Sequence, residues 1–218
     1  LGDFFGDDFE QYSASLKTLD DYVQRFAKDA PQFTPGSQDS YSNYGFIVLG
    51  RIIEAVSGQS YYAYVDEHIL RPAGMTGTGF EPETVNVPQR AVAYTKKDGQ
   101  WVRETKSLPW RGMSAGGGYS TVADMVKFAG ALQSGKLVSP ALLKQATTAQ
   151  NHKGWYGFGF VVQGEGREHQ YGHEGGAPGS NSAIVVMPAQ GYVIVGLANV
   201  DPDAIGNVVN YIARRVPL

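Results

Sequence analysis

The chain has 218 residues, with 28 glycines, no cysteine and a formal net charge of −3. This length suits one domain of ordinary size or two small ones, and it can bury a substantial core. The absence of cysteine excludes a disulfide framework and a thiol nucleophile. The 18 basic and 21 acidic residues form no long single-sign run, so the electrostatic footprint of a nucleic-acid-binding protein is missing. No apolar run approaches the 18 or more residues that a membrane span needs.

Helix start and stop signals are frequent in the first 150 residues. Thr18 and Asp21 have the spacing of a capping box, and Pro31 ends the apolar pattern that follows them. Ser60 can cap a later helix, which Pro72 is expected to end. The predicted helices cover residues 19–30 and 44–56, the segment after Ser60, the segment between Thr121 and Gly135, and a stretch that begins at Pro140.

After residue 150 the apolar pattern changes from helical to extended. Short apolar runs separated by glycine-rich turns predict strands, and the last two runs are apolar on both faces. We therefore expect those two strands in the interior of a sheet that is covered on both sides, with the final helix as one cover. An Asp-Gly pair at 98–99 also favours a hairpin turn. The predicted strands are 155–162, 168–171, 182–187 and 192–197, and the final helix is 204–215.

This order of elements indicates an α+β fold and not alternating βαβ units. We expect a single domain over residues 1–218. Its first part, about 1–150, is predicted to be a mostly helical lobe with loops. Its second part, about 151–218, is predicted to contain the antiparallel strands and the C-terminal helix.

The polar segment Tyr41-Ser42-Asn43, at the entrance to a predicted helix, is a candidate for chemistry. Residues i and i+2 at such an entrance need not follow helical geometry, so the phenol and the amide can face the same cleft. A phenol in that position can transfer protons in general acid–base catalysis. The structural alternative is that Ser42 or Asn43 caps the helix and Tyr41 packs against it.

A second candidate is the glycine-rich segment from Tyr171 to Gly179, at the edge of the predicted sheet. Glycines let a ligand lie along the backbone, and exposed N–H groups there can hold a developing oxyanion. His173 would add a cation or a hydrogen-bond donor. A lone histidine is more often a surface or satisfied core residue, but four glycines in eight positions favour a functional site. His173 and Glu174 lack the spacing and the further ligands of a zinc site, so no metal site is predicted.

A third candidate, Gly112-Met113-Ser114-Ala115-Gly116, matches the Gly-x-Ser-x-Gly nucleophile elbow. A real elbow follows a buried strand and leads directly into a helix. Here polar residues precede the motif, and two more glycines separate Ser114 from the next helix start. An α/β-hydrolase esterase that uses Ser114 is therefore kept only as an alternative.

Further motifs accompany the first two segments. They are Pro35-Gly36, Tyr44-Gly45, Leu49-Gly50-Arg51-Ile52-Ile53-Glu54, Val56-Ser57-Gly58, Arg71-Pro72-Ala73-Gly74-Met75, Ala115-Gly116-Gly117, Ser120-Thr121-Val122-Ala123-Asp124-Met125, Tyr156-Gly157-Phe158-Gly159 and Pro178-Gly179. In this order they resemble the serine β-lactamase and penicillin-binding protein superfamily, specifically its class C β-lactamase-like branch with D,D-peptidases, D-aminopeptidases and esterases. The resemblance covers almost the whole chain. It implies a β-lactamase/transpeptidase-like fold, in which helices and a helical lobe flank an antiparallel sheet.

The resemblance implies a serine hydrolase that works through a covalent acyl-enzyme, with no metal or organic cofactor. By motif, Tyr41 looks like the general base or acid, and Asn43 looks like the amide that orients substrate and lysine. His173 lies at the position of the basic residue in the family's third motif. The backbone N–H of Gly176 resembles half of the oxyanion hole, and Gly175 resembles a substrate-binding residue.

The chain departs from the family pattern because it contains no Ser-x-x-Lys motif. Ala14-Ser15-Leu16-Lys17 has alanine in the serine's place, and the opening segment from Leu1 to Gly6 resembles the loop that follows the nucleophile region. We therefore expect the N-terminal part of the fold, with the nucleophile and its lysine, to lie before Leu1, and this chain alone to be inactive. The alternative is a binding or regulatory homologue that never had the nucleophile.

The expected partner is a small-molecule or peptide-like substrate with an amide, ester or β-lactam carbonyl. His173 in place of lysine weakens the case for β-lactam hydrolysis, because a neutral imidazole binds a carboxylate less firmly than an ammonium does. D,D-peptidases of the family also use His-x-Gly, so the substrate class stays open. Family members are often exported, which suggests a periplasmic or secreted location. The oligomeric state is left open.

Overall fold

The computed structural model describes residues 9–217, so the opening segment from Leu1 to Gly6 lies outside the described residues. The chain divides into two compact units. Unit 1 comprises the chain up to His68 together with Thr78–Arg90 and Lys106–Tyr119, and unit 2 comprises Ile69–Gly77, Ala91–Thr105 and the chain from Ser120 onward. The expectation of a single domain over residues 1–218 stays a prediction.

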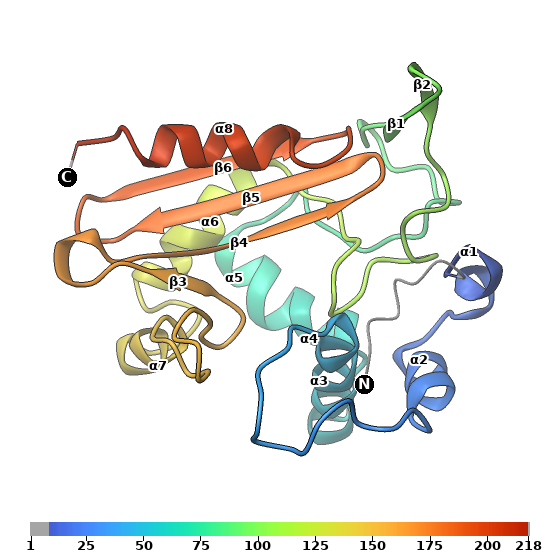
Figure 1. Ribbon diagram of the computed structural model, residues 1–218, viewed down its shortest axis with the longest axis horizontal. Helices are drawn as coiled ribbons and strands as arrows, with labels where there is room; N and C mark the ends of the chain where they lie inside the picture. The colour runs from blue at the N-terminus through green and yellow to red at the C-terminus, as the bar shows by residue number, and fades with distance from the viewer. Residues whose placement is uncertain (1–8, 218) are drawn as a thin grey trace. The chain divides into compact units, whose positions relative to one another are not determined.

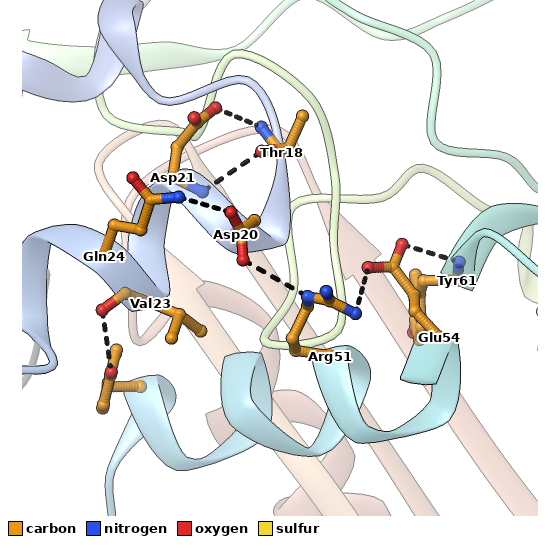
Figure 2. Close-up of polar contacts among 9 residues, drawn as sticks. Thr18, Asp20, Asp21, Val23, Gln24, Arg51, Glu54 and Tyr61 are labelled. Carbon is orange, nitrogen blue, oxygen red and sulfur yellow. Dashed lines mark hydrogen bonds and ion pairs between the residues drawn. The ribbon is translucent and has the colours of Figure 1, made fainter. Parts of the chain in front are cut away.

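Unit 1 is built from helices: α1 (Phe9–Tyr12), the 3-10 turn η1 (Ser13–Ser15), α2 (Leu19–Phe26), α3 (Asn43–Ser57) and α4 (Tyr61–Val65). The predicted capping box is confirmed, because the Thr18 hydroxyl accepts from the Asp21 N–H and the Asp21 carboxylate accepts from the Thr18 N–H (Figure 2). Helix α2 ends at Phe26 and not near residue 30 as predicted. The apolar repeat stops at Phe26, so the residues beyond it have no packing face that would prolong the helix.

Helices α2 and α3 share the hydrophobic core of unit 1, which consists of Phe9, Tyr12, Leu16, Leu19, Tyr22, Tyr44, Ile47 and Met113. A glycine on α3 allows one close contact in this core. A Cβ on Gly50 would lie 2.3 Å from the Ser114 hydroxyl oxygen and 2.9 Å from Leu19 Cδ1. The absence of a side chain at Gly50 therefore lets the segment around Ser114 pack against α3.

The motif residues Arg51 and Glu54 join three helices of unit 1 (Figure 2). Arg51 Nε lies 3.4 Å from Asp20 Oδ1 on α2, and Arg51 Nη1 lies 3.8 Å from Glu54 Oε2 on α3. Glu54 Oε1 accepts the Tyr61 N–H at the start of α4, at 3.0 Å. Because Asp20 and Arg51 are partly exposed, their ion pair adds little stability, and its main effect is to fix where the helices meet.

Unit 2 contains a two-stranded hairpin and a four-stranded antiparallel sheet of order β3-β4-β5-β6 (Figure 1). The hairpin turns at Asp98 and Gly99, both with positive φ, as the Asp-Gly pair predicted. The elements are α5 (Arg71–Ala73), β1 (Tyr94–Lys97), β2 (Gln100–Arg103), α6 (Val122–Gln133), α7 (Pro140–Ala146), β3 (Val161–Gln163), η3 (Gly166–Glu168), β4 (Gln170–Ala177), β5 (Ser180–Met187), β6 (Tyr192–Ala198) and α8 (Ala204–Ala213).

Helices α6 and α8 cover opposite faces of this sheet (Figure 1). Ala129 of α6 packs with Tyr171 and Val186, which are cross-strand partners and therefore share a face. On the other face a Cβ on Gly196 would lie 2.2 Å from Ile205 Cγ1, so β6 lies directly under α8. The predicted α+β class and the cover by the final helix are confirmed.

Three predicted boundaries in unit 2 are wrong, and so is the predicted place of one strand in the sheet. The run 192–197 forms β6, which ends the sheet of the described residues and does not lie in its interior, whereas 182–187 falls within the interior strand β5. Only the end of 155–162 is a strand, since Gly159, with φ 82°, turns the chain sharply before β3. Strand β4 continues well past residue 171, because pairing with β5 overrides the low strand propensity of glycine. Helix α8 ends at Ala213 and not at 215.

The helical path after Ser60 also differs from the prediction. The chain continues from α4 through a π-helical turn, η2 (Asp66–Leu70), into α5, where Pro72 occupies the first turn. Proline has no backbone N–H, and it is tolerated there because the N–H groups in the first turn of a helix have no acceptor within the helix. Gly74, with φ 72°, ends α5 in a left-handed cap. No helix of residues 9–217 is long and apolar enough to cross a membrane.

We predict that Gly50→Ala lowers the free energy of unfolding by about 1–3 kcal/mol, because the added methyl group must displace the Ser114 segment or Leu19. The matched control is Gly45→Ala in the same helix, where the nearest atom to a new Cβ is 3.9 Å away. That variant should be neutral or slightly stabilising, since alanine favours a helix over glycine. Urea denaturation followed by circular dichroism measures both variants, and equal stability of the two would contradict the prediction.

Candidate functional site

In the segment Tyr41-Ser42-Asn43 of unit 1, one residue caps helix α3, and the phenol and the amide on either side of it contact each other. Ser42 is the N-cap of α3, with an extended backbone, and its hydroxyl accepts the Gly45 N–H at 3.2 Å. The extended residue directs its two neighbours to one side, where the Tyr41 hydroxyl donates to Asn43 Oδ1 at 3.2 Å. The Tyr41 ring lies 5.8 Å from the Phe46 ring, and the Tyr41 residue is 42% exposed. Capping by Ser42 thus leaves the phenol and the amide side by side at the helix entrance.

His173 lies on β4, where both of its ring nitrogens have partners. Nδ1 is 2.6 Å from the Glu174 backbone oxygen, and Nε2 is 2.8 Å from the Tyr156 hydroxyl. A carbonyl oxygen only accepts, so Nδ1 carries a hydrogen, and in the neutral imidazole Nε2 is the acceptor for the Tyr156 O–H. The two contacts therefore fix both the orientation and the tautomer of the ring.

Tyr156 is a site residue to which the sequence analysis gave no role. Its Tyr-Gly-Phe-Gly motif contributed to the family resemblance, and that motif is the signal that pointed to it. Asn151 Oδ1 accepts the N–H groups of both Trp155 and Tyr156 at 3.0 Å, which holds this loop in place before β3. The Tyr156 and His173 rings meet edge to face, with centroids 5.7 Å apart.

The glycines after His173 lie on an edge of the sheet. Strand β3 pairs with β4 only over residues 170–172, so among the described residues 173–177 pair with β5 alone. A Cβ on Gly176 would lie 2.5 Å from Pro202 Cγ, and one on Gly175 would lie 3.2 Å from the Ser182 hydroxyl. These glycines are therefore packed closely on their β5 and α8 sides and still belong to a strand edge.

The turn that follows β4 is held by Asp201. Its carboxylate accepts the Gly179 N–H at 2.8 Å and the Lys96 N–H at 3.0 Å. The hydrogen bond from Gly179 is the main cause that lowers the pKa of Asp201, and bonds from the Thr95 hydroxyl and the Lys96 N–H lower this pKa further. Asp201 thus anchors the end of the glycine-rich segment to the β1–β2 hairpin.

The geometry around Ser114 does not favour the nucleophile-elbow alternative. Residues Met113 and Gly116 bridge each other across a tight turn, with no strand leading into it and no helix following it. The Ser114 hydroxyl oxygen is buried and has no hydrogen-bond partner among the described residues. An elbow serine instead needs an exposed oxygen on a strand-to-helix turn.

The five predicted site residues fall into two groups. Tyr41 and Asn43 belong to unit 1, where their side chains are hydrogen-bonded to each other. His173, Gly175 and Gly176 belong to unit 2, where they follow one another along β4. Both groups are of the kind used in acyl transfer: a phenol with an amide, and a histidine followed by backbone groups on a strand edge.

An antiparallel sheet with helices on both faces, together with these motifs, defines the β-lactamase/transpeptidase-like class of proteins. The beta-lactamase family model matches residues 1–216, and the chain belongs to this family. A relative in Bacillus subtilis, "Putative penicillin-binding protein PbpX", is 31% identical over 198 residues, which are 89% of this chain and 49% of that protein. The chain spans about half the length of the curated relatives it matches.

Two solved structures confirm the predicted β-lactamase/transpeptidase-like fold. The penicillin-binding protein of Bacillus halodurans superposes with a TM-score of 0.89 at 28% identity, covering 98% of this chain and 69% of that one. The D-stereospecific amidohydrolase of a Streptomyces species superposes with a TM-score of 0.79 at 25% identity, covering 98% and 66%. The chain is therefore homologous to penicillin-binding proteins and to amide-hydrolysing enzymes.

We predict that His173 in its neutral form is the Nδ1–H tautomer, because the Glu174 carbonyl requires a donor. Long-range ¹H–¹⁵N correlation spectra of the neutral ring measure the tautomer directly. In Tyr156→Phe the Nε2 resonance should shift as its hydrogen bond is lost, while the Nδ1–H form persists. A dominant Nε2–H form in the unmodified protein would refute this arrangement.

We predict an acid-dependent loss of stability at Asp201. A carboxyl with a lowered folded-state pKa stabilises the protein above its unfolded-state pKa of about 4, and this stabilisation is lost as the pH falls through the folded-state value. Asp201→Asn should therefore be less stable than the unmodified protein at pH ~7, and the difference should shrink at pH ~3. Thermal melts of both proteins at the two pH values measure this. Asp98→Asn, at the tip of the β1–β2 hairpin, is the control, and a difference independent of pH would contradict the assignment.

Proposed function

We propose that this chain is part of a serine hydrolase that cleaves an amide, ester or β-lactam carbonyl through an acyl-enzyme intermediate. Its nucleophile lies outside the chain, because the 218 residues contain no Ser-x-x-Lys motif. The serine oxygen attacks the substrate carbonyl, the leaving group departs with a proton, and water then releases the acyl group. The first step requires a proton acceptor near the serine and hydrogen-bond donors for the developing oxyanion.

The observation that carries this proposal is the hydrogen bond between the Tyr41 hydroxyl and Asn43 Oδ1 at the entrance of α3. In the proposed mechanism the Tyr41 phenol transfers the proton, and the Asn43 amide orients the substrate and the incoming lysine. Ser42 supports this assignment because its hydroxyl caps the helix, which leaves its two neighbours with side chains on one side. An N-cap also fixes the start of the helix, so the two polar groups have a defined position.

The second part of the proposal concerns β4. His173 is proposed as the polar residue that binds an anionic or polar end of the substrate, and the Gly176 N–H as an oxyanion donor beside Gly175. The edge position of residues 173–177 supports this role, because backbone groups on that edge are not covered by β3. The fixed orientation of the His173 ring supports it too, since a preorganised polar group costs little reorganisation during the reaction.

The names of the relatives support a small amide or peptide substrate. They include the D-stereospecific amidohydrolase and the penicillin-binding proteins, and a relative in Escherichia coli bears the name of a D-alanyl-D-alanine carboxypeptidase. We propose the same class of substrate here, with a D-amino acid next to the cleaved bond. A periplasmic or secreted location stays a prediction.

We predict that Tyr41→Phe in the full-length protein lowers kcat/KM for a p-nitrophenyl ester by about 100-fold or more, because the proton-transfer group is lost while the ring still packs on Phe46. Tyr192→Phe, at a tyrosine of similar exposure on β6, is the matched control and should retain full activity. Unchanged turnover in Tyr41→Phe would refute the assigned role.

Labelling of the full-length protein distinguishes the proposed function from the esterase alternative and from the binding or regulatory homologue. A fluorophosphonate probe should label the full-length protein at a serine outside this chain, and Ser114→Ala should leave the labelling intact. Labelling that disappears in Ser114→Ala would favour the esterase alternative. A full-length protein without any Ser-x-x-Lys and without labelling would favour the binding or regulatory homologue.

A further inference from the structure

Asn181 is a buried amide of β5 that the sequence analysis did not single out. Its side chain is on the face of the sheet that α8 covers, and the residue is only 5% exposed. Nδ2 donates to the Gly175 carbonyl oxygen at 3.0 Å. Oδ1 accepts the N–H of Ile205 at 2.7 Å and the N–H of Gly206 at 3.2 Å. One amide therefore joins the glycine-rich part of β4 to the first turn of α8.

The start of α8 explains why the acceptor half of this amide is needed. The first N–H groups of a helix have no partner within the helix, and a side chain at the N-cap usually accepts one of them. The N-cap of α8 is Asp203, whose side chain makes no such bond. Asn181 supplies the missing acceptor from β5, so its oxygen performs the role of a helix cap.

The donor half of Asn181 acts on the peptide group between Gly175 and Gly176. A peptide unit is planar, and in its trans form the carbonyl oxygen of one residue and the N–H of the next point in opposite directions. A hydrogen bond that fixes the Gly175 oxygen therefore also fixes the direction of the Gly176 N–H. It also polarises the peptide group, which strengthens that N–H as a donor.

The neighbouring residues of β4 are held from the same side. The Glu174 carboxylate accepts the Asn210 side-chain N–H of α8 at 2.8 Å. Pro202, in the loop before α8, lies where a side chain on Gly176 would be. Without side chains of their own, Gly175 and Gly176 have much backbone freedom, so their position depends on such outside contacts.

We infer that Asn181 is a positioning residue, which aligns the Gly176 N–H for the developing oxyanion by holding the Gly175 carbonyl. The inference rests on the proposed function, in which Gly176 is an oxyanion donor. The role inferred for Asn181 differs from a purely structural role because the donor half and the acceptor half of its side chain have separate tasks. The acceptor half stabilises α8, and the donor half serves the reaction.

Asn181→Asp separates these two tasks. Its carboxylate still accepts from Ile205 and Gly206, where the helix N-terminus favours negative charge. It has no N–H for the Gly175 oxygen and places an acceptor against it. In the full-length enzyme we expect kcat for an ester substrate to fall by about 10- to 100-fold with little change in KM, while the melting temperature stays close to that of the unmodified protein.

Asn199→Asp is the matched control, because Asn199 also donates from its side-chain amide to a backbone carbonyl, that of Val92, at 2.7 Å. It should retain the kcat of the unmodified enzyme. Full kcat in Asn181→Asp, together with a lower melting temperature in Asn181→Ala, would show that Asn181 is only a helix cap and would overturn the inference. Asn181→Ser, which offers a capping hydroxyl without an amide, replaces Asn181→Asp if that variant does not fold.

Amide hydrogen exchange measured by NMR tests the geometry independently of turnover. In Asn181→Asp the Gly176 amide should change its chemical shift and exchange rate, while the Ile205 and Gly206 amides remain protected. An unchanged Gly176 amide would overturn the inference even in an active enzyme. If the unmodified protein lacks hydrolase activity but the Gly176 amide responds as expected, the proposed function fails and the peptide-positioning contact stands.

Discussion

The close approach of β4 to its neighbours is the constraint on which the rest of unit 2 depends. A Cβ on Gly172 would lie 1.9 Å from the Ile184 carbonyl oxygen, and one on Gly176 would lie 2.5 Å from Pro202 Cγ. Only glycine fits at these two positions, so the strand can pair with β5 while the loop before α8 lies directly on it. The glycine-rich segment therefore has a packing role in addition to the proposed substrate-binding role, and both follow from the same lack of side chains.

The starts of the helices could be predicted because their signals are local in sequence. The side chains of Thr18, Ser42, Ser60, Thr121 and Ser139 each accept an N–H three residues further along the chain. A spacing of three residues is visible without any knowledge of the fold. The ends of α2 and α8 were predicted less well, because a helix ends where its packing partner ends. Adjacency in sequence also made the Tyr41–Asn43 pair predictable.

Contacts between distant residues could not be predicted in this way. The buried carboxylate of Asp124, near the start of α6, accepts the Gly77 N–H at 2.7 Å, from a residue 47 positions away. The bond between Tyr156 and His173 and the contacts of Asn181 likewise depend on strand register, which no local pattern in the sequence specifies. Strand β4 was predicted too short for the same reason, since its glycines extend only because β5 pairs with them.

These distant contacts are concentrated along the segment from His173 to Gly179. Tyr156 holds the imidazole of His173, Asn181 holds the carbonyl of Gly175, and Asp201 holds the N–H of Gly179. A glycine-rich strand loses more conformational entropy on folding than other strands do. Its backbone pairing alone therefore holds it less firmly in one conformation. Side chains from three other parts of unit 2 supply the missing restraint. The segment therefore combines a backbone edge that β3 leaves unpaired with fixed peptide directions, and this combination is what separates a preorganised site from a flexible loop.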